Sequence, residues 1–266
     1  MPPRINVIRA WAVLLLVAAL PAVTFADASL TVAVASNFQI TARKIALRFS
    51  ESTGIEVRII AGSTGKLYAQ IVNGAPYDVF LAGDTERPAK LVEDTVADSE
   101  SYLIYATGYL VLWSNNPKFS GRDCYADLMQ SDFSYLSIAN PNTAPYGLAA
   151  QEFLSESGLW DVVQEKLVFG ENISQAFQFV ASKNATMGLI AASQVAGQIP
   201  FETTCYQPLL TGTGERISVR QAGVILAQTR NSNAAQRFME FMQTPGIVAL
   251  MQNSGYGAPI VASDGW

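Results

Sequence analysis

The stretch VRIIAGSTGKLYAQIVNGAPYDVFLAG, residues 57–83, decides the fold. It begins with a β-branched segment typical of a strand, continues into the helix-forming segment KLYAQIVNG and ends in a second strand, YDVFLAG. The turn before the helix is GSTG, residues 62–65. A Gly-rich turn at a helix start leaves N–H groups free, and proteins hold anions at such places. The stretch therefore predicts a β-α-β unit with an anion site at its first turn.

The segments before this stretch extend the same pattern. SLTVAVASN, residues 29–37, is typical of a strand, and FQITARKIALRFSESTG, residues 38–54, has apolar residues at helical spacing and stops at Gly54. The resulting β-α-β-α-β order predicts a parallel sheet with helices on both faces. In such sheets, ligands bind at the carboxyl ends of the strands, where the helices begin.

The remaining residues predict a second α/β unit. Its elements are a strand at 108–116 after a helix-loop region at 85–107, a strand at 134–141, one long helix at 144–163, a strand at 166–170, a helix at 171–184, a strand and then a helix within 186–195, and a long apolar strand at 217–229. A helical segment at 233–257 follows, with a break at Pro245-Gly246.

These patterns predict two α/β lobes. The first unit is interrupted by the second, and the chain crosses between them in strands near 106–110 and 222–226. We define lobe I as residues 29–106 with 226–266, and lobe II as residues 107–225. Two crossing strands predict a hinge, with a cleft between the lobes.

Residues 1–28 have the composition of a signal peptide. Arg4 and Arg9 form a basic start, an apolar run follows, and ADA at 26–28 offers small residues for cleavage. A membrane anchor is the alternative, but the run is short for a span of about 20 residues, and Pro21 interrupts it. We expect export, cleavage and a periplasmic location.

The charge and the absence of His exclude several classes of function. Without residues 1–28, which hold two Arg and one Asp, the chain has 15 basic and 21 acidic side chains, a net charge of −6. Nucleic acid and acidic membranes are therefore poor partners. The lack of His excludes Ser-His-Asp catalysis and His-ligated zinc. A bound anion would have to be held by neutral donors.

Cys124 and Cys205 are the two cysteines of the chain. In an oxidising compartment such a pair indicates one disulfide, and two buried free thiols are the alternative. A C-x-x-C redox motif is absent.

Four predicted helix starts share the chemistry of an anion site. They lie at Ser36, at the turn 62–65, at Ala144-Pro145 and at Asn172. Ser36 and Asn172 are candidate N-caps with a Gln three residues later, and Pro145 suits a first helical position. Each start leaves unpaired N–H groups and about half a positive charge, so four starts aimed at one point would bind a small dianion. Ordinary capping is the alternative for each.

The segment GSTGKL at 62–67 also resembles part of a nucleotide P-loop. That motif needs Gly at position 60 and Ser or Thr at position 67, where this chain has Ile60 and Leu67. We therefore reject a P-loop, and we expect Lys66 to be solvated.

Several segments resemble periplasmic molybdate-binding proteins, which serve ABC importers. They occur in the order of that family: AVASNF at 33–38, GSTGKLYAQIVNGAPYDVFLAGD at 62–84, ANPNTAPYGLAA at 139–150, GENISQAFQFVASKNATMGLIA at 170–191 and NSGYGAPI at 253–260. The resemblance implies a type II substrate-binding protein whose two lobes are joined by two β-strand crossovers.

The resemblance also implies an oxyanion in the cleft, held by hydroxyl and N–H groups without direct cation ligands. Lobe I would contribute a hydroxyl and an N–H from Ser36 and from Ser63, and a donor from Asn37. Lobe II would contribute the phenol of Tyr146 and the backbone N–H of Ile173.

One position departs from another branch of the family. That branch has a Tyr where this chain has Ala191. We therefore expect Tyr146 to supply the phenol and Ala191 to have no ligand role. A small residue near 144–145 would add a backbone contact.

We expect a monomeric binding protein that captures molybdate, and tungstate with little discrimination, and delivers it to an inner-membrane ABC permease and its ATPase. No cofactor is expected. A fully deprotonated oxyanion offers only acceptors, so a shell of donors favours molybdate, tungstate or sulfate over phosphate. The alternatives are a binding protein for another tetrahedral oxyanion such as sulfate, and an enzyme with Ser63 as nucleophile. The lack of an obvious base argues against the enzyme.

Overall fold

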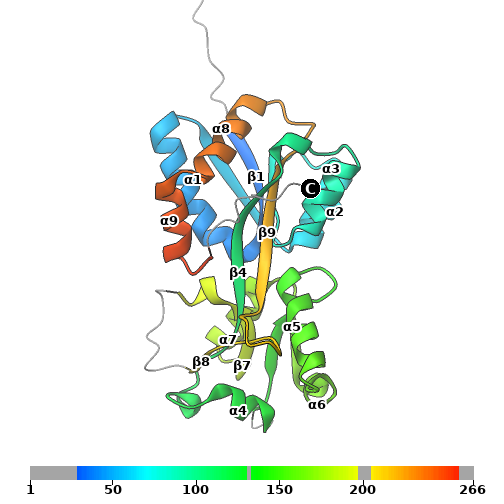
Figure 1. Cartoon of the computed structure of the whole chain (residues 1–266), viewed down its shortest axis with the longest axis vertical. Helices are drawn as coiled ribbons and strands as arrows, with labels where there is room; N and C mark the ends of the chain where they lie inside the picture. Colours follow the sequence, from blue (N-terminus) through cyan, green and yellow to red (C-terminus); the bar gives the residue numbers. More distant parts are fainter. Residues whose placement is uncertain (1–28, 131–132, 197–204, 258–266) are drawn as a thin grey trace, which may run out of the picture.

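The computed structural model describes residues 29–130, 133–196 and 205–257. The predicted signal peptide and the last residues of the segment at 253–260 lie outside these ranges. The described chain forms two lobes joined by the long strands β4 (Leu103–Ser114) and β9 (Ser218–Ile225) (Figure 1). The prediction of a two-lobed α/β fold with two β-strand crossovers is confirmed. In the described ranges, no helix is both long and apolar enough to cross a bilayer.

Lobe I is built on a mostly parallel sheet. Its own elements are β1 (Ser29–Ala35), η1 (Ser36–Phe38), α1 (Gln39–Thr53), β2 (Glu56–Gly62), α2 (Thr64–Val72), β3 (Val79–Leu81), α3 (Glu86–Glu93), η2 (Ser99–Ser101), α8 (Ser232–Met242) and α9 (Pro245–Asn253). Strand β1 pairs in parallel with β2 and β3, and β3 pairs antiparallel with β9. The predicted parallel β-α-β-α-β order is therefore confirmed.

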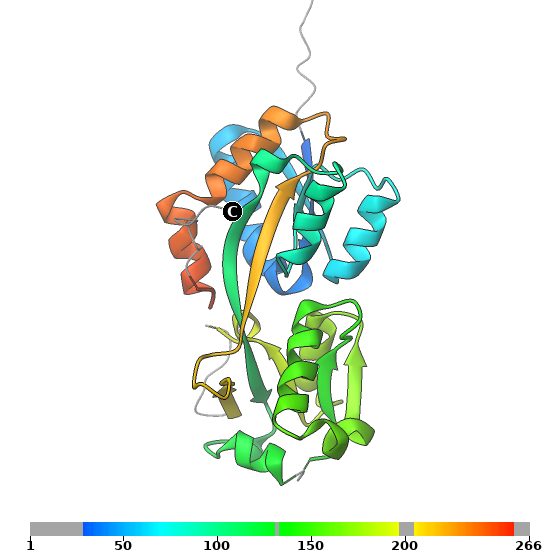
Figure 2. The ribbon, with the colours of Figure 1, turned by 45° about the vertical axis from the view of Figure 1, so that its right-hand side comes forward.

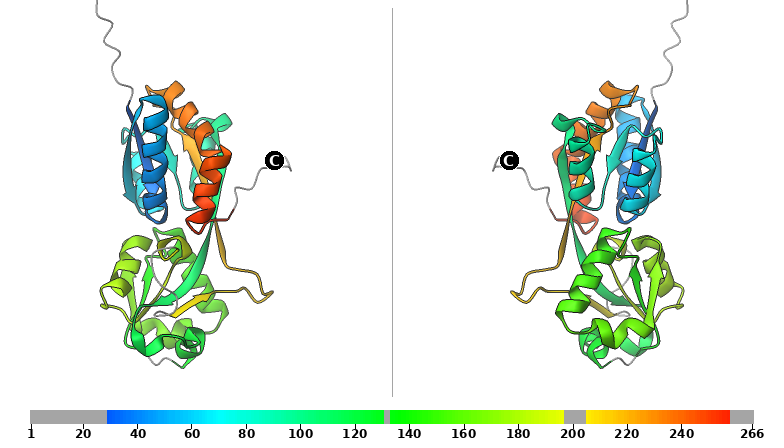
Figure 3. Two further views of the ribbon diagram at one scale, coloured as in Figure 1. Left: turned by 90° about the vertical axis from the view of Figure 1, so that its left-hand side faces the viewer. Right: turned by 90° about the vertical axis from the view of Figure 1, so that its right-hand side faces the viewer.

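Side chains alternate across the lobe I sheet and create two cores. Leu30, Val32 and Val34 of β1 pack with α1, α8 and α9. Ala33 points to the opposite face, where Leu67 of α2 packs, together with residues of α3. Helices therefore cover both faces of the sheet, as Figure 3 shows from two sides.

Lobe II repeats the α/β plan with a single core. Its elements are η3 (Pro117–Phe119), α4 (Cys124–Met129), β5 (Leu136–Ala139), α5 (Pro145–Glu156), α6 (Trp160–Val163), η4 (Gln164–Lys166), β6 (Leu167–Gly170), α7 (Ile173–Ala181), β7 (Met187–Ala191), η5 (Ala192–Gln194) and β8 (Cys205–Pro208). Strand β5 pairs in parallel with β6 and β7, while β4 pairs antiparallel with β7 and β8. A disulfide between Cys124 and Cys205 ties α4 to β8, with a Cα–Cα distance of 5.9 Å.

Two sequence expectations in these elements were wrong, and one strand was missed. The single helix expected at 144–163 is split into α5 and α6, because Gly158 adopts a left-handed φ of 67° after α5. Strand β4 begins at Leu103, earlier than expected, because its pairing with β9 begins there. Strand β8 was not anticipated from the sequence. Its four residues pair with β4, and the strand lies off the main strand order of the sheet.

The two strands change lobes within a few residues of each other. On β4, Ala106 packs in a lobe I core, and Leu110 packs in the lobe II core. On β9, Val219 packs with lobe II, and Val224 packs with lobe I. We propose that the second crossing lies near Gln221, a few residues before the boundary inferred from sequence. Figure 2 shows the strands as the continuous connection between the lobes.

Candidate anion-binding site

A small cavity lies between the lobes, where η1, α2, α5 and α7 begin. It measures about 10 Å³ and is lined by Ala35, Ser36, Asn37, Gly62, Ser63, Thr64, Ala144, Pro145, Tyr146, Asn172 and Ile173. All five residues predicted to bind an oxyanion are therefore brought together, and Ala191 is not among the lining residues. By this measure the space in this closed arrangement is about that of one water molecule.

Lobe I supplies two serines from neighbouring strand ends. Ser36 follows β1 and Ser63 follows β2, and the register of these parallel strands places Ala35 opposite Gly62. The pleat and the register therefore bring both serines to the same edge of the sheet. Ser36 is not the N-cap that its sequence suggested: Ala35 holds that position, and no side chain caps η1.

The hydroxyl of Ser63 has no hydrogen-bond partner among the described residues. Ser63 is only 2% exposed, and it occupies the N-cap position of α2 without capping the helix through its side chain. A buried hydroxyl that lacks a partner is destabilising, and native proteins keep few of them. The orphaned Oγ of Ser63 therefore indicates an acceptor that enters the cavity from outside the protein.

Lobe II supplies donors from the first turns of two helices. Tyr146 is the second residue of α5, and Ile173 is the first residue of α7. Asn172 caps α7, as expected, because its Oδ1 accepts from the N–H groups of Ser174 at 3.0 Å and Gln175 at 3.1 Å. The cap does not engage the N–H of Ile173, which stays available beside the cavity.

Tyr146 is fully buried, and burial raises the pKa of its phenol well above the ordinary value. The phenol therefore keeps its hydrogen throughout the neutral and mildly alkaline range. No Asp or Glu is among the described residues that line the cavity. The part of the chain that the structure describes also contains no cluster of His, Cys, Asp or Glu that could hold a metal ion. The described lining is thus neutral and rich in hydrogen-bond donors.

Asn37 participates in a buried network that sequence analysis missed. Its Nδ2 donates to Oε1 of Gln221 at 3.0 Å and to the hydroxyl of Tyr256 at 3.3 Å. The Tyr256 hydroxyl donates back to the main-chain carbonyl of Asn37 at 2.8 Å. The side-chain N–H groups of Asn37 are therefore occupied within the protein, which leaves its backbone N–H for a ligand. The sequence did not single out Gln221, because it follows Arg220 in the polar first half of β9.

Direct contacts between the lobes close around the cavity. The N–H of Gly65 donates to the carbonyl of Thr143 at 2.8 Å, and Oγ of Ser174 donates to the carbonyl of Ser36 at 3.0 Å. Gly65 permits this approach, since a Cβ there would lie 3.0 Å from the Thr143 oxygen.

The expectation that Lys66 is solvated holds in part. Its side chain is 51% exposed, and its Nζ forms an ion pair at 2.8 Å with Glu171. Lys66 lies in lobe I and Glu171 in lobe II. The pair therefore bridges the lobes at the rim of the cavity rather than contacting a guest.

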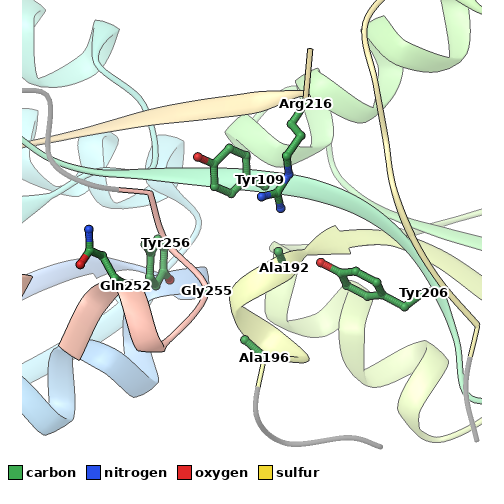
Figure 4. Close-up of a pocket in the computed structure, with 8 residues that line it drawn as sticks. All are labelled: Tyr109, Ala192, Ala196, Tyr206, Arg216, Gln252, Gly255 and Tyr256. Atoms are coloured by element: carbon green, nitrogen blue, oxygen red, sulfur yellow. The ribbon is translucent and has the colours of Figure 1, made fainter. Parts of the chain in front are cut away.

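A larger cavity of about 220 Å³ lies where the end of α9, η5 and the crossover strand β4 meet (Figure 4). In it, the guanidinium carbon of Arg216 lies 3.8 Å from the ring centroid of Tyr109. Tyr256 also lines this cavity, while its hydroxyl reaches Asn37 in the smaller one. Tyr256 therefore lines the larger cavity with its side chain and holds the backbone of Asn37, which lines the smaller one, through a hydrogen bond.

The chain is similar to known solute-binding proteins over nearly all of its described length. Residues 30–257 match the family described as bacterial extracellular solute-binding protein. The molybdate-binding protein ModA of Azotobacter vinelandii is 40% identical over 236 residues, which cover 86% of this chain and 90% of the relative. ModA of Rhodobacter capsulatus is 36% identical over 245 residues, covering 90% of each chain.

A solved structure agrees with these relatives. The periplasmic molybdate-binding protein of Azotobacter vinelandii superposes with a TM-score of 0.79 at 36% identity and covers 86% of this chain and 99% of that one. Similarity therefore extends through both lobes and both crossover strands. The chain belongs to the bacterial extracellular solute-binding protein family, in the branch that contains these molybdate-binding proteins.

Proposed function

We propose that this protein captures molybdate in the cavity between its lobes and delivers it to an ABC permease with its ATPase. The protein acts in the periplasm as a monomer after its signal peptide is cleaved. Molybdate is its cargo, and no cofactor takes part. The observation that carries this proposal is the buried hydroxyl of Ser63, which faces a compact cavity without a partner.

The proposed shell consists of donors from both lobes. Ser36 and Ser63 each give a hydroxyl and a backbone N–H, and Asn37 gives its backbone N–H. Tyr146 gives its phenol and Ile173 its backbone N–H. The helix starts add partial positive charge that favours an anion.

The absence of an acidic side chain from the cavity lining favours a fully deprotonated oxyanion. Protonated phosphate carries a hydrogen that needs a strong acceptor, and no carboxylate is among the described residues that line the cavity. Molybdate, tungstate and sulfate carry only acceptors at neutral pH. We propose molybdate as the cargo because of the named relatives, and we expect tungstate to bind with similar affinity. Sulfate is the second candidate because it presents the same acceptors.

The hinge gives a simple mechanism of capture. The anion first meets the donors of one lobe, and closure about β4 and β9 adds the donors of the other. The interlobe bonds of Gly65 and Ser174 form at the same time. The closed form then differs in shape from the open one, which allows a permease to distinguish them.

A thermal melt of the purified mature chain tests this function. Molybdate, tungstate, sulfate and phosphate are added separately at one concentration. A ligand at 100 times its dissociation constant stabilises by about 2.7 kcal/mol, which for a chain of this length raises the Tm by roughly 5–11 °C. We expect this shift with molybdate and tungstate. A shift with sulfate alone would replace molybdate by sulfate, and no shift with any anion would overturn the proposal.

A further inference from the structure

We propose that Gln221 is a positioning residue that turns the phenol hydrogen of Tyr146 toward the bound oxyanion. The inference rests on the proposed function and adds a residue that does not itself line the cavity. It assigns to the crossover strand β9 a role in ligand recognition besides its role as a connection.

Gln221 occupies a central place between the lobes. It is fully buried in β9, where the strand passes from lobe II to lobe I. Its side chain reaches Asn37 of lobe I at 3.0 Å and Tyr146 of lobe II at 3.3 Å. One amide therefore contacts a predicted ligand residue from each lobe.

The direction of the hydrogen bonds follows from a main-chain carbonyl. The Tyr256 hydroxyl donates its only hydrogen to the carbonyl of Asn37, so it can only accept from the Asn37 side chain. The Asn37 atom that faces Tyr256 is therefore Nδ2, which also donates to Gln221. The Gln221 atom that accepts is Oε1, so its Nε2 faces Tyr146.

A further contact lies on the Oε1 side of this amide. The hydroxyl of Tyr105 is 3.0 Å from Oε1 of Gln221 and 2.9 Å from the carbonyl of Ala82. Its single hydrogen is shared between these two acceptors.

These hydrogen-bond directions leave the phenol hydrogen of Tyr146 free to donate to a ligand. The phenol oxygen accepts from Nε2 of Gln221, and a phenol has one hydrogen left to donate. None of the hydrogen bonds among the described residues uses that hydrogen. An oxyanion in the cavity is an acceptor at the right place, because Tyr146 lines it.

Gly108 on the neighbouring crossover strand leaves room for this arrangement. A Cβ at position 108 would lie 1.8 Å from the Tyr146 hydroxyl and 2.6 Å from Nε2 of Gln221. Any larger residue would therefore push the phenol and the amide apart. Both crossover strands thus contribute to the placement of the phenol.

A double-mutant cycle with molybdate as the titrant tests the inference. Calorimetric dissociation constants are measured for the wild type, Gln221→Met, Tyr146→Phe and the double variant. We expect Tyr146→Phe to weaken binding about 10- to 100-fold, as for a hydrogen bond to a charge. Gln221→Met should weaken binding about 5- to 10-fold in the wild type and leave it unchanged when Tyr146 is already Phe. Melts without ligand verify that each variant is folded.

The outcomes separate the two proposals. Wild-type protein that does not bind molybdate overturns the proposed function. If the wild type binds molybdate and Gln221→Met binds it equally well or more tightly, the inference is overturned. The amide would then not be directing the phenol hydrogen toward the ligand. Equal losses from Gln221→Met with and without the Tyr146 hydroxyl also overturn it, because the amide would then act without the phenol, for example through its contact with Asn37. As a second variant, Gly108→Ala should weaken binding in the wild type but not in Tyr146→Phe.

Discussion

The two lobes build their halves of the cavity in different ways. Lobe I uses the ends of two adjacent parallel strands, so Ser36 and Ser63 are placed by the register of β1 and β2. Lobe II uses helix starts, and its phenol contacts Gln221 on the crossover strand. The two serines of lobe I are therefore placed by local sequence, whereas Asn37 and the Tyr146 phenol depend on a residue of the crossover strand. Binding should accordingly respond differently to changes in each lobe.

The lobes also differ in covalent support, and removing it should have the largest effect. The disulfide of lobe II closes a separation of 81 residues, and a loop of this length stabilises by about 4 kcal/mol in the chain-entropy account. The double variant Cys124→Ala, Cys205→Ala should lose most of that free energy of unfolding, measured with urea. Molybdate affinity at a temperature where the variant is folded should change less than about twofold, because neither Cys lines the cavity. A large loss of affinity in folded protein would show that the disulfide helps to shape the lobe II half of the site.

Ser63→Ala tests the lobe I half of the site. The variant should lose about 1.5–3 kcal/mol of binding free energy, as for a hydrogen bond to a charged group. Its Tm without ligand should stay the same or rise, because the lost hydroxyl has no hydrogen-bond partner in the part of the chain that the structure describes. Calorimetry and melts measure the two quantities.

Ser101→Ala is a matched control in the same lobe. The Ser101 hydroxyl donates to the carbonyl of Asp98 at 2.6 Å and accepts from the N–H of Ile225 at 2.8 Å. This variant should lose about 1 kcal/mol of stability and keep its affinity. A Ser63→Ala variant that behaves like this control would mean that Ser63 has a structural role only.

The smallest effect is expected at the rim, where Lys66 and Glu171 pair across the lobes. Both side chains are about half exposed, so the pair contributes at most about 1 kcal/mol to closure. Lys66→Met should weaken molybdate binding by no more than about fivefold, and the difference should shrink as salt rises. Lys90→Met is the control, since its partner Asp94 lies in the same lobe. Equal effects of the two substitutions would mean that the Lys66–Glu171 pair does not contribute to closure of the lobes.

The sequence allowed the lobe I half to be predicted because its parts are contiguous. A strand, a Gly-rich turn and a helix place Ser63 within one short segment, and the same holds for Ser36 after β1. In lobe II, the sequence predicted Asn172 as a helix N-cap, and this cap leaves the N–H of Ile173 free. The ligand roles themselves were assigned in both lobes through family resemblance rather than through spacing: those of Ser36, Asn37, Ser63, Tyr146 and Ile173.

The network behind the cavity could not be predicted in this way. Asn37, Gln221 and Tyr256 lie at separations of up to 219 residues, and only the folded hinge brings them together. Sequence suggested a side-chain donor at Asn37, yet tertiary contacts engage that amide. The break after α5 was also missed, since the turn at Gly158 interrupts a segment with continuous helical character.

We propose that the cavity binds a dianion through neutral donors from both lobes. Calorimetric titration of molybdate into the purified mature chain near pH 7.5, in two buffers with different ionisation enthalpies, tests it most directly. Burial keeps the pKa of the Tyr146 phenol raised, so this donor stays protonated below pH 10 and is lost only as the pH rises through its higher folded value. We predict one molybdate per chain and the same heat in both buffers, because no proton is exchanged. Heats that differ between the buffers, or no binding, would contradict the account.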